Sequence, residues 1–94
     1  MKKSINPRAV AIQRRFFEAL ELAISSGRLK GLKSFCDAHD LNRPKYSSIR
    51  NSLGKPADET TYKMIDIDAL AALCADLDVS AEWLLLGRGK MTKR

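Results

Sequence analysis

The sequence predicts an all-α domain of five helices, and three observations support this fold class. Apolar residues recur at helical spacing in five stretches of the chain. Residues that favour helix ends flank these stretches, with Asn6 and Ser80 before two of them and Gly27 and Gly87 after two. Strand-forming residue types gather only at residues 60–62, and one such short run does not make a sheet.

Length and charge limit the kinds of protein and partner. The 94 residues form one small domain, and an apolar fraction of 45% is enough for its core. The formal net charge of +6 favours an anionic partner. Residues 58–82 contain seven acidic residues and one lysine, a local charge of −6, and the rest of the chain carries +12. A polyanion should therefore meet roughly the first sixty residues or the C-terminal tail.

The first helix is expected at residues 7–26, after a loose arm at residues 1–6. Asn6 caps its start, Pro7 suits its first position and Gly27 ends it. The expected inward stripe contains Ile12, Phe16, Phe17, Leu20, Ala23 and Ile24, and the expected water-facing residues are Arg8, Arg14, Arg15, Glu18 and Glu21. Val10 and Leu22 lie off the stripe, where they are either half-exposed or part of a subunit contact.

Two short helices with a tight corner between them are expected at residues 32–39 and 43–53. The first of the two buries Leu32, Phe35 and Cys36 at helical spacing. Asp40 lies at the corner in a left-handed or bridge conformation, which aspartate tolerates better than most residues other than glycine.

The helix after the corner presents two different faces. Asn42 caps it, Pro44 lies in its first turn and Gly54 ends it. Its inward residues are Tyr46, Ile49 and Leu53, a spacing that favours a core position for Tyr46 over base stacking. Its outer residues are Arg43, Lys45, Ser47, Ser48, Arg50 and Asn51. No acidic residue occurs between residues 41 and 57, and such a face suits the major groove of DNA.

The C-terminal part of the chain adds two more helices. Residues 55–65 are expected to form an extended loop. A fourth helix should start at Asp66 and carry on one face Ile67, Leu70, Leu73, Cys74 and Leu77. Ser80 should cap a last helix at residues 81–86, in which Trp83 and either Leu84 or Leu85 turn inward. A basic, mobile tail is expected at residues 88–94.

Several function classes are disfavoured. Cys36, His39 and Cys74 are three possible zinc ligands, but a structural zinc site normally has four ligands at paired spacings. We therefore expect no metal and no cofactor. No combination of acid, base and nucleophile indicates an enzyme. Neither a signal peptide nor a membrane-spanning run is visible, and two unpaired cysteines suit a reducing compartment, so we expect a cytoplasmic protein.

Three parts of the sequence resemble one known family. They are Phe35-Cys36 before the corner, the interval from Leu41 to Tyr46 and Ile49, and the run VSAEWLLLGRG at residues 79–89. Over residues 12–87 the chain resembles the Cro and lambda-repressor-like (XRE-type) DNA-binding domains. The resemblance implies a domain at residues 7–87 with a helix-turn-helix at the second and third of five helices. Asp40 stands where the family usually has glycine.

The same resemblance implies where DNA would be contacted. The N-terminal turn of the third helix would enter the major groove. The implied base-facing residues are Arg43, Pro44, Lys45, Ser47 and Ser48, and the implied phosphate-contacting residues are Lys33, Arg50, Asn51 and Lys55. Lys45 could reach a base or a phosphate. Arg43 is the residue best suited to specify a base, because a guanidinium binds O6 and N7 of guanine together.

The leading hypothesis is a small bacterial or phage repressor that binds double-stranded DNA in a sequence-specific manner as a homodimer. The alternative is a protein-interaction module, such as an antitoxin or adaptor, whose fourth and fifth helices hold a partner. The acidic segment at residues 58–82 motivates this alternative. RNA binding is a weaker third hypothesis, because exposed aromatic residues for base stacking are missing.

Overall fold

The computed structural model describes residues 6–53 and 64–92. In that part of the chain it contains five helices, which are α1 (Pro7–Ser25), α2 (Leu32–Ala38), α3 (Arg43–Ser52), α4 (Ile67–Asp76) and α5 (Ala81–Leu86). The all-α prediction is confirmed, with helix ends within a residue or two of those expected. The arm at residues 1–5, the helix stop at residue 54 and most of the loop at residues 55–65 lie outside the described residues.

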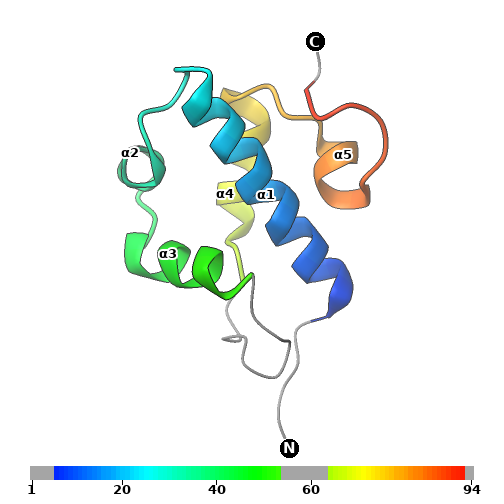
Figure 1. Ribbon diagram of the computed structural model, residues 1–94, viewed down its shortest axis with the longest axis horizontal. Coiled ribbons are helices and arrows are strands. Elements are labelled where there is room, and N and C mark those ends of the chain that lie inside the picture. The colour runs from blue at the N-terminus through cyan, green and yellow to red at the C-terminus, as the bar shows by residue number, and fades with distance from the viewer. Residues whose placement is uncertain (1–5, 54–63, 93–94) are drawn as a thin grey trace, which may run out of the picture.

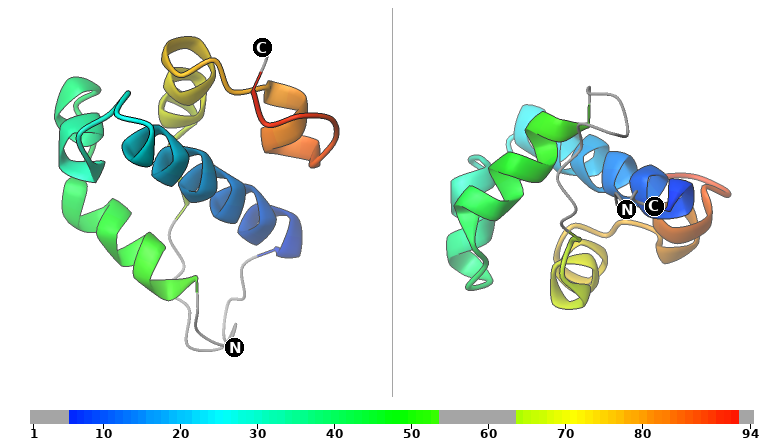
Figure 2. Two further views of the ribbon diagram at one scale, coloured as in Figure 1. Left: turned by 45° about the horizontal axis from the view of Figure 1, so that its top comes forward. Right: turned by 90° about the horizontal axis from the view of Figure 1, so that it is seen from below.

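Helix α1 is the central element of the molecule. It contacts α3, α4 and α5, and α2 contacts α3. Figure 1 shows α2 and α3 on one side of α1 and α5 on the other, with α4 behind. The turned view in Figure 2 (left) shows the same division, with α2 and α3 on one flank of α1 and α4 and α5 on the opposite flank.

An aromatic cluster occupies the centre of the core. Phe16 on α1 lies fully buried, with its ring centroid 5.0 Å from Phe17, 5.9 Å from Phe35 and 6.0 Å from Tyr46. The first two pairs meet edge to face, which is a favourable arrangement for aromatic rings. Because Phe35 belongs to α2 and Tyr46 to α3, this cluster fixes both helices to α1.

The inward stripe of α1 matches the prediction with three differences. Phe16, Phe17, Leu20 and Ala23 are buried as expected, and Ile12 and Ile24 are half-buried. Gln13 and Ala19 are also buried, although neither was assigned to the stripe. The Nε2 atom of Gln13 lies 4.0 Å from the sulfur of Met64. Arg15 was expected to face water, but it is half-buried and donates a hydrogen bond to the carbonyl of Leu84 in α5.

The inward face of α4 differs from the prediction. Ile67 was expected to face the core, yet 83% of its surface is exposed. Ala69 and Leu73 are fully buried, and Leu77, at the next position of the same i, i+4, i+8 row, is also buried. Ile67 precedes Ala69 by two residues, so it points away from that row. Leu70 and Cys74 lie at its edge and are half-buried.

Helix α5 and the segment after it pack against the body. Oγ of Ser80 accepts a hydrogen bond from the amide of Trp83, and Gly87 ends the helix in the left-handed conformation, with a φ of 71°. Leu84 takes the buried position, so the choice between Leu84 and Leu85 is decided. Within the segment from residue 88 that was expected to be a mobile tail, Met91 packs against the core, and its carbonyl accepts a hydrogen bond from the amide of Ser80 at 2.8 Å.

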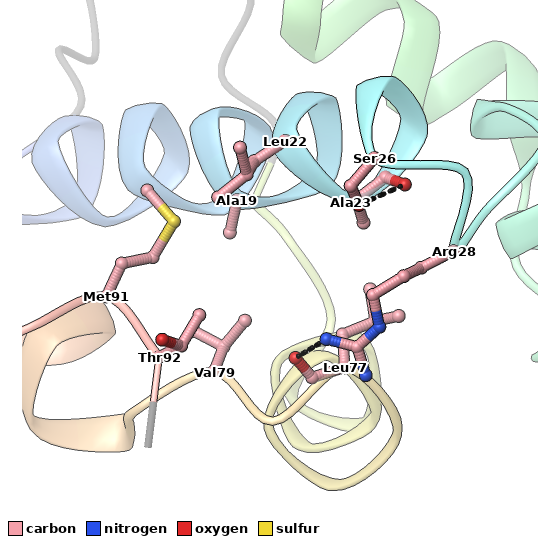
Figure 3. Close-up of a pocket in the computed structure, with 9 residues that line it drawn as sticks. All are labelled: Ala19, Leu22, Ala23, Ser26, Arg28, Leu77, Val79, Met91 and Thr92. Carbon is pink, nitrogen blue, oxygen red and sulfur yellow. Dashed lines mark hydrogen bonds between the residues drawn. The ribbon is translucent and has the colours of Figure 1, made fainter. Parts of the chain in front are cut away.

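Three arginines bind carbonyl groups at the ends of other helices. A helix leaves its last four carbonyls without helical partners and carries partial negative charge there. Arg14 donates to the carbonyl of Leu53 after α3 (3.2 Å), and Arg15 donates to that of Leu84 in α5 (2.8 Å). Arg28 donates to the carbonyl of Leu77 after α4 (3.2 Å), as Figure 3 shows. These bonds tie α1 and the turn that follows it to three other helices.

Figure 3 also shows a small cavity beside the contact of Arg28. Its volume is about 190 Å³, and α1, the link from α4 to α5 and the chain end at Met91 and Thr92 surround it. Its lining is mainly apolar, from residues such as Ala19, Leu22 and Val79. The end of the described chain thus forms one wall of this cavity.

Candidate nucleic-acid interface

The corner between α2 and α3 is built by a helix-ending hydrogen bond. The amide of Leu41 donates to the carbonyl of Cys36 at 2.8 Å, which is the six-to-one bond of a Schellman motif. The residue before Leu41 in this motif adopts the left-handed conformation, and Asp40 has a φ of 54°. The predicted left-handed aspartate is confirmed. Leu41 packs against the core, so the chain turns sharply before α3 begins.

Helix α3 is capped at its start and anchored along its inner face. The side-chain oxygen of Asn42 accepts the amide of Lys45 at 3.0 Å, as predicted for the cap. Tyr46 and Ile49 are fully buried, and the hydroxyl of the buried Ser52 donates to the carbonyl of Ile49 at 2.8 Å. The assignment of Tyr46 to the core is confirmed. The inner face of α3 is therefore held by apolar packing over most of its length.

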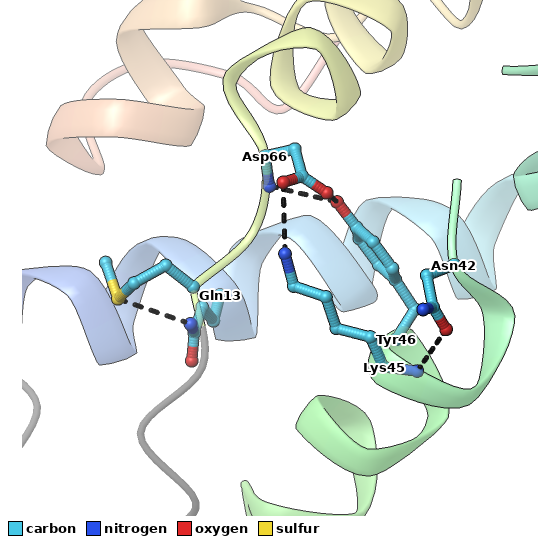
Figure 4. Close-up of polar contacts among 6 residues, drawn as sticks. Gln13, Asn42, Lys45, Tyr46 and Asp66 are labelled. Atoms are coloured by element: carbon cyan, nitrogen blue, oxygen red, sulfur yellow. Dashed lines mark hydrogen bonds and ion pairs between the residues drawn. The ribbon is translucent and has the colours of Figure 1, made fainter. Parts of the chain in front are cut away.

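A polar cluster joins α3 to the start of α4 (Figure 4). One carboxylate oxygen of Asp66 accepts the Tyr46 hydroxyl at 2.7 Å, and the other lies 3.0 Å from Nζ of Lys45. The amide of Asp66 donates back to the Tyr46 hydroxyl at 2.9 Å. Asp66 precedes α4 as its cap residue, but its side chain makes no capping bond, because it binds α3 instead.

These contacts shift two protonation equilibria in opposite directions. The hydrogen bond from the Tyr46 hydroxyl, followed by that from Lys45, lowers the pKa of Asp66 below its ordinary value of 3.8. Burial raises the pKa of Tyr46 well above its usual range. Over the whole neutral pH range, Tyr46 therefore stays protonated and donates a hydrogen bond to an ionised Asp66.

The outer face of α3 holds most of the residues predicted to read bases. Arg43 and Pro44 are exposed, and Ser47 and Ser48 are half-exposed beside them. Helical spacing places residues 43, 47 and 50 in one row and residues 44, 48 and 51 in the next, both away from the buried row of residues 46, 49 and 52. The fold therefore brings together on one surface four of the five predicted base-facing residues.

Lys45 is the exception among the predicted base-facing residues. It lies on the flank of α3 that faces α4, where its ammonium group binds Asp66 and lies 5.8 Å from the centre of the Tyr46 ring. A side chain held in this way does not project with Arg43 and Pro44. The sequence contained no local signal for this contact, because Asp66 is 21 residues away.

The predicted phosphate-contacting residues lie around this surface. Arg50 and Asn51 are exposed on α3, and Lys33 is exposed near the start of α2. Lys55 lies outside the described residues. An open depression of about 330 Å³ at the start of α2 is lined by Lys30, Gly31, Lys33, Ser34 and Asp37. Lys30 was not among the predicted phosphate-contacting residues, although its position shortly before α2 could have suggested it.

The cysteines and the histidine occupy separate environments. Cys36 is fully buried, and burial raises the pKa of its thiol. His39 ends α2, where its Nε2 lies 3.1 Å from a carboxylate oxygen of Asp76 and its ring packs on Phe35. Among residues 6–53 and 64–92, no three histidine, cysteine or acidic residues are grouped closely enough to hold a metal ion.

Comparisons with models of known protein families, with curated proteins and with solved structures found no match to this chain. None of the helices in the described part of the chain is both long and apolar enough to span a membrane.

Proposed function

We propose that the protein is a sequence-specific regulator that binds double-stranded DNA, with α2 and α3 as a lambda-repressor-like helix-turn-helix. The observation that carries this proposal is the outer face of α3. It presents cations and short polar groups without an acidic residue, on a helix anchored from behind by Tyr46 and Ile49. A helix of this kind can enter the major groove without rearranging the core.

In this proposal each exposed residue of α3 has a defined role. Arg43 binds O6 and N7 of a guanine, which is worth about 1–3 kcal/mol of discrimination against other bases. Pro44 contacts a thymine methyl group, and Ser47 and Ser48 let the helix approach the base pairs closely. Arg50 and Asn51 bind phosphate groups on the flanks of the groove.

The start of α2 supplies a further phosphate contact. Lys33 and Lys30 line the same depression there, and Gly31 before the helix has no side chain that could obstruct a phosphate. The first amide groups of a helix also favour anions. Asp37 also lines the depression and offsets one of the two lysine charges, so the depression keeps a net positive charge.

A single recognition helix reads only a few base pairs, so we propose a homodimer acting in the cytoplasm as a small bacterial or phage repressor. Two-fold symmetry would place two copies of α3 about 34 Å apart, on half-sites one helical turn apart. The operator would then be an inverted repeat.

Selection of bound duplexes from a random DNA pool by the purified protein tests this proposal. We expect enrichment of an inverted repeat containing a guanine in each half-site. Arg43→Ala should weaken binding to the enriched duplex about tenfold and relax the preference at that guanine, because it removes the paired hydrogen bonds. Arg88→Ala, which removes an exposed arginine after α5, is the matched control. A pool without enrichment, or an Arg43→Ala variant with unchanged preference, would contradict the proposal.

One observation favours the alternative of a protein-interaction module built on the same fold. Ile67 at the start of α4 is 83% exposed, and two leucines of α5 are exposed as well. Exposed apolar side chains are often part of protein contacts. A stoichiometric complex with a protein partner, together with no retardation of DNA of any sequence, would favour this function over the first.

A further inference from the structure

A groove between α1 and α5 is distinct from the α3 surface. It has a volume of about 430 Å³, and its lining residues are Arg8, Ala11, Arg15, Leu85, Leu86 and Arg88. The three α1 residues follow one another at i, i+3 and i+7, so they form one row along that helix. The C-terminal end of α5 and the residue after Gly87 form the other side.

Two leucines give the α5 side of this groove an apolar surface that is open to solvent. Leu85 is 45% exposed and Leu86 is 61% exposed, because Leu84 takes the single inward position in this turn of α5. Ala11 lies opposite them and adds no polar group. Adjacent exposed leucines beside a groove are typical of a contact surface for another protein.

The groove is positively charged. Among the residues that the structure describes, its lining contains three arginines and no acidic residue. Arg15 is fixed in place, because its guanidinium donates to the carbonyls of Leu84 (2.8 Å) and Leu85 (3.3 Å). Arg8 and Arg88 are exposed and keep their side chains available for a carboxylate.

Charge and apolarity together select one class of occupant. A nucleic-acid backbone matches the arginines but has no group to cover the two leucines. A second copy of the same groove would oppose three arginines with three more, and like charges placed opposite each other cost several kcal/mol. An acidic amphipathic helix matches both features, with apolar residues for the two leucines and carboxylates for the arginines.

We propose that this groove binds an acidic amphipathic segment of a partner protein, with its apolar face on Leu85 and Leu86 and its carboxylates on Arg8 and Arg88. Figure 1 shows α5 and α3 on opposite sides of α1. The bound segment therefore leaves the outer face of α3 uncovered. The proposal does not depend on DNA binding.

A labelled peptide with leucine and glutamate residues at amphipathic helical spacing tests the proposal, beside a matched peptide in which lysine replaces every glutamate. Fluorescence anisotropy with the full-length protein should show binding of the acidic peptide and none of the basic one. The double variant Arg8→Glu/Arg88→Glu should lose at least about tenfold in affinity for the acidic peptide and bind the basic one instead, since the charges are exchanged. Leu86→Ser should weaken binding of the acidic peptide to the wild-type protein and, when added to the double variant, binding of the basic peptide.

The matched control is Arg43→Glu/Arg50→Glu, which reverses two exposed arginines of α3, changes the net charge by the same amount and should leave peptide binding unchanged. If this control weakened binding of the acidic peptide as strongly as the charge reversal at the groove does, the net charge alone would hold the peptide and the proposal would be wrong. Equal binding of both peptides, or no binding of either, would also overturn it. All substituted residues are exposed, so each variant should fold, and circular dichroism checks this.

Discussion

Asp66 connects distant parts of the chain through both its side chain and its backbone. Its carboxylate binds the Tyr46 hydroxyl and the Lys45 ammonium group, and its amide binds Tyr46 again. The buried ring of Tyr46 brings the aromatic core and this polar cluster into contact. Asp66 therefore fixes α3 relative to α4, and it also keeps one lysine away from the outer face.

The pH dependence of stability should report the Asp66 contact. Since the folded-state pKa of Asp66 lies below 3.8, its stabilising effect is present above that pH and is lost as pH falls through the lower folded-state value. Tyr46→Phe removes the largest cause of the shift. We expect it to cost about 1 kcal/mol at neutral pH, because the carboxylate is 41% exposed and water replaces part of the bond.

Urea unfolding followed by circular dichroism from neutral pH to about pH 2 measures this effect. The free energy of unfolding of Tyr46→Phe should fall less steeply with acid than that of the wild type. Equal acid dependence of the two proteins would show that another carboxylate dominates the transition.

Neutralising Asp66 should also change DNA binding, if the proposed function is right. Asp66→Asn keeps an acceptor for Tyr46 but removes the ion pair with Lys45, so the lysine becomes available to a phosphate. We expect tighter binding at low salt and a salt dependence steeper by about 0.9 decade of affinity per decade of salt. Asp68→Asn, two residues further on α4, is the control. A wild-type salt slope for Asp66→Asn would show that Lys45 does not reach the DNA.

Helix α1 stabilises the fold with its polar residues as well as with its apolar stripe. Arg14 and Arg15 are neighbours in sequence, yet they bind carbonyl groups at the ends of α3 and α5 on different sides of the molecule. Arg28, in the turn after α1, binds the carbonyl of Leu77 at the end of α4. Each helix end would otherwise leave carbonyl groups to water alone. The position of α1 between the other helices makes this arrangement possible.

Arg15→Met should destabilise the protein by about 1–2 kcal/mol, because the carbonyls of Leu84 and Leu85 lose a charged donor while the apolar stem is largely kept. Arg8→Met removes an exposed guanidinium from the same row of α1 and should cost much less. Chemical denaturation of both variants measures the difference. Equal stability of the two variants would mean that solvent replaces the Arg15 bonds without cost.

At the scale of the whole molecule, the total of 17 lysine and arginine residues overstates the number of cationic side chains that are free to reach DNA in the proposed function. Arg14, Arg15 and Arg28 bind carbonyl groups at the ends of other helices, and Lys45 is paired with Asp66. The exposed cations around α3 are fewer than the composition suggests. The number of neutralised phosphates should therefore be set by a few identified side chains.

If the proposed function is right, a titration of affinity for the enriched DNA duplex against salt counts those side chains. Each phosphate contact contributes about 0.9 to the slope of log affinity against log salt. Lys33→Ala and Arg50→Ala should each reduce the slope by about that amount, whereas Arg88→Ala on the far side of α1 should leave it unchanged. If all three variants shifted the slope equally, the protein would bind DNA through its overall charge and not through the α3 surface.

Local chemistry alone determined much of this structure. The caps Asn42 and Ser80, the left-handed Asp40 and the inward positions of Tyr46 and Ile49 all depend on residues within one or two helical turns. Such features are readable from the sequence because the helical period and the needs of helix ends are local. The exposed row of Arg43, Ser47 and Arg50 follows from the same period.

Only the tertiary structure decided which polar groups meet across the fold. The pairing of Lys45 with Asp66, the contact of Arg15 with α5 and the exposure of Ile67 all depend on how helices distant in sequence approach one another. The sequence around each of these residues does not distinguish it from an ordinary solvent-facing or core-facing residue of a helix. Long-range packing sets the distance between such groups, and that distance determines whether a charged side chain contacts a partner within the protein or remains available to an external one.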